Sequence, residues 1–178
     1  MNLLDASTAT CQVFTYKEGL LSAVAHDLKI EVQRFTMEVD PVARTICATF
    51  DATSLSVVCA MKNGVERPDA LSAKDRRDIE ENIAKDVLVT KKSRDITFRA
   101  SQVEETGAGF RVRGDLRIRD KTRPVTFMVR PTGDNVEAEV RLHQPDFGIK
   151  PFAAMLGALK IKPDIEVRLA VPRKAVLP

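Results

Sequence analysis

Apolar and polar residues alternate along much of the chain, and residues 110–119 (FRVRGDLRIR) show this pattern most clearly. In this segment apolar side chains at every second position are separated by arginine or aspartate. Successive side chains of a β-strand point to opposite faces, so the segment is predicted to form a strand with one apolar and one charged face. Gly114 falls in the apolar series and indicates either a bend in a curved sheet or a close approach to the backbone.

Other segments repeat this period of two, and turn signals such as Asp40-Pro41 separate them. These segments are residues 28–33, 95–99, 125–129, 136–143 and 165–171. Strands that are apolar on only one face need a second layer or closure on themselves. We therefore predict an all-β fold, a single antiparallel β-barrel of about eight strands, with a two-sheet sandwich as the alternative.

A surface helix is predicted over residues 72–85, where the alternation stops. Ser72 and Asp75 have the spacing of a capping box, with an acid in place of the usual glutamate or glutamine. Charged residues leave only Ile79 and Ile83 as a narrow apolar stripe. This composition is typical of a helix that lies on a barrel or across one of its openings.

A second, short helix is predicted over residues 151–159, because proline is favourable at a first helical position. Four apolar residues follow at helical spacing: Phe152, Met155, Leu156 and Leu159. We find no internal repeat, low-complexity tract or linker, so residues 1–178 are predicted to form one domain.

The composition argues against several classes of partner. The net charge is only +3, aromatic residues make up 5% and tryptophan is absent, so neither a concentrated basic face nor a base-stacking platform for nucleic acid is expected. The arginines of residues 110–119 are interpreted as a solvated face. No run of residues approaches a membrane span, and the N-terminus lacks a signal-peptide pattern, so a cytoplasmic protein is expected. The sequence is compatible with a homodimer.

Little in the sequence indicates catalysis. The three cysteines have no metal-ligand spacing and are interpreted as free, buried thiols. The two histidines, His26 and His143, are expected at a buried strand end and on a polar face. No nucleotide-binding or serine-hydrolase motif is present, so we expect no cofactor, no metal site and no catalytic residue.

The order of several motifs resembles the YceI-like family. The resemblance is carried by ITFRASQV (residues 96–103), RVRGDLRIRDKTRPVTFMV (111–129) and QPDFGIKPF (144–152), and more weakly by residues 20–40 and 86–88. It spans most of the chain. The resemblance implies a lipocalin-like antiparallel barrel that accommodates a polyisoprenoid or another long-chain amphiphile.

On this resemblance we predict non-catalytic binding of a long-chain lipid, either a polyisoprenoid or a fatty-acid-like molecule, in the barrel interior. The second predicted helix would cover the mouth, where Lys150, Lys160 and Lys162 could meet an anionic head group. The predicted lining residues are Phe14, Val24, Leu28, Ile30, Phe50, Phe98, Leu116, Ile118, Phe127, Phe147, Ile149, Phe152 and Leu156.

Two alternatives are kept open. One is a structural or interaction protein with a filled core, which predicts no cavity beyond a few waters. The other is an enzyme with a site at the barrel mouth that uses His26.

Overall fold

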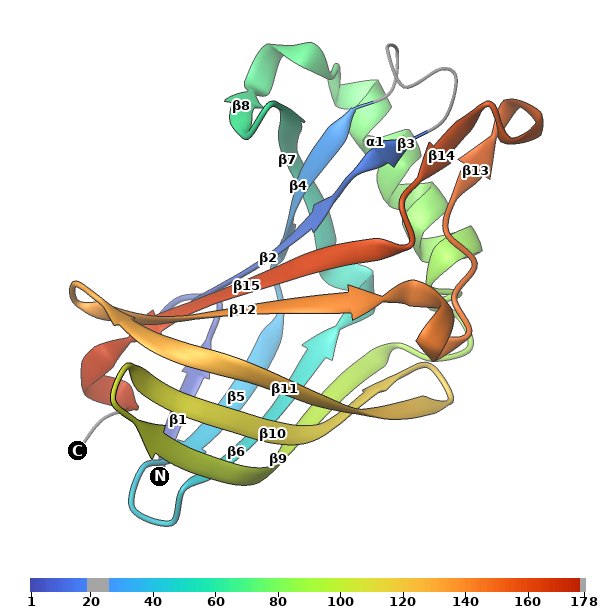
Figure 1. The fold of residues 1–178 in the computed structure, drawn as a ribbon. Helices are drawn as coiled ribbons and strands as arrows, with labels where there is room; N and C mark the ends of the chain where they lie inside the picture. The colour runs from blue at the N-terminus through green and yellow to red at the C-terminus, as the bar shows by residue number, and fades with distance from the viewer. Residues whose placement is uncertain (19–25, 177–178) are drawn as a thin grey trace.

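The computed structural model describes residues 1–18 and 26–176 of the chain. Within these residues, twelve strands form one antiparallel sheet and three short strands form a second sheet. The order in the main sheet is β1-β5-β6-β9-β10-β11-β12-β15-β2-β4-β7-β8, and the order in the small sheet is β13-β14-β3. Figure 1 shows that the main sheet curls strongly, with α1 beside it.

The described elements have the following bounds. The strands are β1 (Asn2–Asp5), β2 (Thr10–Thr15), β3 (Lys17–Glu18), β4 (Asp27–Val32), β5 (Phe35–Asp40), β6 (Thr45–Asp51), β7 (Leu55–Lys62), β8 (Val65–Arg67), β9 (Asp95–Thr106), β10 (Gly109–Ile118), β11 (Lys121–Thr132), β12 (Asn135–His143), β13 (Ala153–Ala154), β14 (Leu159–Ile161) and β15 (Asp164–Pro172). The helical segments are α1 (Ala73–Asn82), the π-helical η3 (Ile83–Val87), and the short 3-10 turns η1 (Ala52–Ser54), η2 (Pro68–Ala70), η4 (Gln144–Phe147), η5 (Met155–Gly157) and η6 (Arg173–Ala175).

Bends within long strands make the main sheet curl strongly into a half-barrel. Only Gln33 and Arg34 separate β4 from β5, although these strands lie far apart in the sheet order. The turn η1 connects β6 to β7 in the same way, and β6 and β7 pair with β5 and β4. The predicted all-β, antiparallel architecture is confirmed. The predicted barrel of about eight strands is instead a half-barrel of twelve strands with β1 and β8 at its edges, in part because such bends divide long strands.

Strand β10 shows how the sequence pattern becomes a two-faced sheet. Val112, Leu116 and Ile118 are buried, while the arginines between them are exposed to solvent. The pairing with β9 is irregular at Gly114. A Cβ atom at this position would lie 2.4 Å from the carbonyl oxygen of Arg99 and 2.6 Å from the Phe98 ring. Gly114 therefore marks both a bend and a close approach.

The first predicted helix is confirmed. The Ser72 side chain accepts a hydrogen bond from the backbone of Asp75, and the Asp75 carboxylate accepts one from the backbone of Ser72. Ile79 and Ile83 pack against a buried cluster on the sheet. The Glu80 carboxylate accepts a hydrogen bond of 2.7 Å from the backbone N–H of Val57 in β7, which fixes the helix to the sheet.

The capping box allows a direct test of this helix. We expect Ser72→Ala to lower the free energy of unfolding by about 1 kcal/mol, because the N–H of Asp75 loses its acceptor. Urea unfolding followed by circular dichroism measures the change. The control is Ser93→Ala, because Ser93 makes no hydrogen bond within the described residues. Equal stability of the Ser72 variant and wild type would exclude a stabilising cap.

The second predicted helix is wrong. In its place β13 and β14 form a hairpin, which β3 extends into the small sheet. Leu156 and Gly157 have φ angles of 56° and 85° at the tip, and such left-handed conformations are incompatible with a continuing α-helix. The helical spacing of the apolar residues in this segment is coincidental.

Candidate ligand-binding cavity

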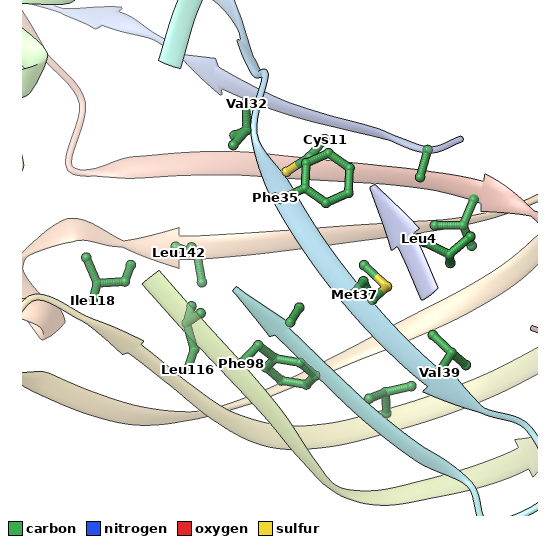
Figure 2. Close-up of a cluster of buried hydrophobic side chains, with 14 of the residues drawn as sticks. Leu4, Cys11, Val32, Phe35, Met37, Val39, Phe98, Leu116, Ile118 and Leu142 are labelled. Carbon is green, nitrogen blue, oxygen red and sulfur yellow. The ribbon is translucent and has the colours of Figure 1, made fainter. Parts of the chain in front are cut away.

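The curled sheet surrounds a cavity of about 610 Å³ that is lined mainly by apolar side chains. Alternation along the strands determines the lining, because every second residue faces inward. On β15 the inward residues are Ile165, Val167, Leu169 and Val171. Figure 2 shows inward side chains from separate strands converging on one another. The volume lies within the range of roughly 300–1,000 Å³ that is typical of small-molecule sites.

Seven of the thirteen predicted lining residues contribute to the cavity wall: Ile30, Phe50, Phe98, Leu116, Ile118, Phe127 and Ile149. They come from five strands and from the segment after η4, so residues distant in sequence meet around one space. The Phe98 and Phe127 rings pack with their centroids 5.6 Å apart.

The other predicted residues lie elsewhere. Phe147 and Leu28 are buried but lie outside the cavity wall, and Leu28 packs in the cluster that contacts α1. Phe152 is half-buried, and Leu156 is fully exposed at the hairpin tip. Val24 lies outside the described residues.

Phe14 lies on the opposite face of β2 from the cavity. The guanidinium of Arg168 lies over its ring, 4.5 Å from the centroid. The inward residues of this strand are instead Cys11, Val13 and Thr15. The sequence of β2, TCQVFT, has no strongly polar face, so the large aromatic residue gave a misleading indication of which face points inward.

Sequence reasoning missed many of the lining residues, including Cys11 and a helical segment. Cys11 is buried in the wall, and burial raises the pKa of its thiol to about 12, so the thiol is protonated at neutral pH. Ile83, Val87 and Leu88, at the end of the helical segment, close one side of the cavity. The narrow apolar stripe of the helix was the signal that pointed to this contact.

Most polar lining residues gather at the two ends of the cavity. Arg44, Glu105 and Arg173 lie at the end formed by the β5–β6 and β9–β10 turns and by η6. Thr15 and Gln144 lie near the other end, where β15 begins. The three predicted mouth lysines (Lys150, Lys160 and Lys162) are absent from the described cavity wall.

Asp51, at the edge of the cavity, connects the β4–β5 bend, the turn η1 and the residue before β9. Its carboxylate accepts hydrogen bonds from Arg34 and Arg94 and also caps η1 through the backbone of Thr53. Hydrogen bonds, led by those from Arg94, hold the pKa of this carboxyl well below its usual range. The charged group therefore supports the bends of the sheet.

The Asp51 cluster predicts a pH dependence. We expect Asp51→Asn to lower the free energy of unfolding by about 1–2 kcal/mol at neutral pH, because the two guanidinium groups lose a charged acceptor. The Asp51 carboxyl has a lower pKa in the folded than in the unfolded protein, so its ionised form stabilises the fold. This stabilisation is complete above the unfolded pKa of about 4 and is lost as the pH falls toward the folded pKa. Urea unfolding of both proteins between pH 7 and about pH 3 checks this expectation, which fails if the difference stays constant.

Neither histidine belongs to the described wall of the cavity. His26 is half-buried, and the adjacent Asp27 accepts a hydrogen bond from the backbone of Lys17. His143 lies 2.7 Å from the Asp164 carboxylate on the exposed surface. Within residues 1–18 and 26–176, no three histidine, cysteine or acidic side chains are grouped as metal ligands.

Comparison with known families identifies the fold. The YceI-like domain profile matches residues 4–172 of the chain. The chain belongs to the YceI-like family. No significant match was found among curated proteins. Across the described residues of this YceI-like protein, no helix is long and apolar enough to cross a membrane.

Solved structures show the same fold at low sequence identity. BcnA of Burkholderia cenocepacia superimposes with a TM-score of 0.62 and 14% identity, over 94% of this chain and 98% of that one. A polyisoprenoid binding domain from Saccharophagus degradans gives a TM-score of 0.58 and 10% identity, over 96% and 95%. The Campylobacter jejuni YceI protein gives 0.58 and 13%, over 83% and 84%.

Proposed function

We propose that this YceI-like protein holds a long-chain apolar or amphiphilic molecule, either a polyisoprenoid or a fatty-acid-like lipid, without catalysis. The observation that carries the proposal is the apolar cavity of about 610 Å³ inside the curled sheet. A structure of the same fold is described as a polyisoprenoid binding domain, which supports the same class of ligand.

The wall of the cavity suits a chain of methylenes or isoprene units. Burying each methylene contributes about 0.8 kcal/mol, so affinity grows with the length of chain that the cavity accepts. The wall is built largely from valine, isoleucine, leucine and phenylalanine, which offer contact area rather than directional bonds. Such a site selects for shape and length.

The cavity also bears on the two alternatives. A protein with a filled core predicts no space beyond a few waters, which disagrees with the observed volume. An enzyme that uses His26 needs this side chain at the site, but His26 is absent from the described cavity wall. Non-catalytic binding of a long-chain ligand is therefore the function that we favour.

Extraction and thermal denaturation test the proposal together. We expect organic extracts of the purified protein to contain a long-chain amphiphile that mass spectrometry detects. We also expect an added isoprenoid at one hundred times its dissociation constant to stabilise the fold by about 2.7 kcal/mol, or roughly 5–10 °C in melting temperature. Absence of both a co-purifying amphiphile and a thermal shift would refute the proposal.

A further inference from the structure

Two polar side chains interrupt the apolar cavity wall near one end. Thr15 lines the cavity, and its hydroxyl oxygen is buried without a hydrogen-bond partner in the described part of the chain. A buried hydroxyl without a partner costs free energy, typically about 1–3 kcal/mol. The hydroxyl of Thr15 therefore needs a partner that the described chain does not supply.

Gln144 supplies a second polar group and is fixed in place. The side chain is only 6% exposed, and its Nε2 donates a hydrogen bond of 3.0 Å to the carbonyl oxygen of Lys162. This bond orients the amide and leaves Oε1 as an acceptor without a donor among the described residues. Gln144 also lines the cavity.

The strand register places these two groups at the same end. Thr15 follows Phe14, which pairs with Glu166 of β15, so Thr15 lies beside Ile165. On the other side of β15, Leu142 pairs with Ile165, and Gln144 follows two residues later. Thr15 and Gln144 therefore flank the beginning of β15. The lining residues Arg44 and Arg173 lie at the opposite end.

We propose that Thr15 and Gln144 form a subsite for an uncharged hydroxyl head group, so that the protein prefers long-chain alcohols. This inference rests on the proposed function. The ligand hydroxyl donates to Gln144 Oε1 and accepts from the hydroxyl of Thr15, while the chain extends toward the end that carries Arg44. An anionic head group would find no lysine or arginine among the described lining residues beside Thr15.

Matched ligands and an isosteric variant test the subsite. Hexadecanol and hexadecane have the same chain length and differ by one hydroxyl, and each competes against the fluorescent polyene parinaric acid. We expect wild type to bind hexadecanol about three- to tenfold more tightly than hexadecane, because one or two hydrogen bonds are gained. Thr15→Val should remove most of this preference and raise the free energy of unfolding by about 1–3 kcal/mol, because a methyl group replaces the buried hydroxyl that lacks a partner. The control Thr106→Val, at the opposite end, should keep the preference.

The possible failures are distinguishable. If neither the probe nor the two hexadecyl ligands bind, the proposed function and the subsite both fail. If the probe binds but hexadecanol does not displace it, only the subsite fails. If hexadecane binds but hexadecanol has no advantage, or if the advantage survives in Thr15→Val, the subsite is refuted and the cavity remains a binding site. If palmitate binds more tightly than hexadecanol and loses affinity in Arg173→Gln but not in Thr15→Val, the head group lies at the opposite end and the proposal is overturned.

Discussion

Ala138→Phe is expected to weaken the binding of a long-chain ligand by roughly 30-fold. Ala138 is buried in the middle of β12 and lines the cavity, so a phenyl group there would occupy ligand space. Excluding two or three methylenes of a bound chain costs about 2 kcal/mol, which corresponds to this factor. Because the added ring is apolar and enters existing space, we expect the fold to be retained. Competition against parinaric acid measures the affinity.

The neighbouring residue provides a matched control. Glu137 precedes Ala138 on the same strand and is exposed on the outer face of the sheet. Glu137→Phe adds the same ring outside the cavity and should leave ligand affinity unchanged. If the Ala138 variant folds and binds as tightly as wild type, the ligand does not occupy this cavity.

Gly114→Ala is expected to cost about 1–3 kcal/mol of folding free energy. The new Cβ would meet the carbonyl oxygen of Arg99 at 2.4 Å and the Phe98 ring at 2.6 Å, so the backbone of β9 or β10 must shift. For a chain of this size, each kcal/mol lowers the melting temperature by roughly 2–4 °C. Differential scanning calorimetry measures this change.

Gly107 provides the corresponding control. This residue lies in the turn between β9 and β10, and a Cβ there would meet no atom within 4 Å. Gly107→Ala is therefore expected to change stability by less than about 1 kcal/mol, because the smaller conformational freedom of the unfolded chain acts in the stabilising direction. Equal effects of the two substitutions would mean that the close approach at Gly114 contributes nothing to stability.

The sequence predicts the parts of the fold where polarity alternates strongly. On β10, arginine and aspartate occupy one face, so only one arrangement buries Val112 and Leu116. The capping box at Ser72 is similarly local and could be predicted from two residues. The bends at Gln33 and Arg34 depend on how the whole sheet curls, and the number of strands was therefore not predictable.

The candidate site was less predictable, because lining a cavity depends on which face of a strand turns inward. On β2 both faces are apolar or weakly polar, and Phe14 faces outward beneath Arg168 while the smaller Val13 faces the cavity. The segment around Leu156 has helical spacing, but a left-handed turn and pairing with β3 make it a hairpin. The placement of Thr15 and Gln144 on either side of the start of β15 arises from strand register.

The central claim is that the interior of the curled sheet holds a long-chain molecule, and a crystal structure of the protein with a bound isoprenoid alcohol tests it most directly. We expect continuous tubular density inside the cavity, in contact with Leu116 and Phe127 and ending beside Thr15 and Gln144. Density only on the outer surface, or an empty cavity at saturating ligand, would contradict the claim.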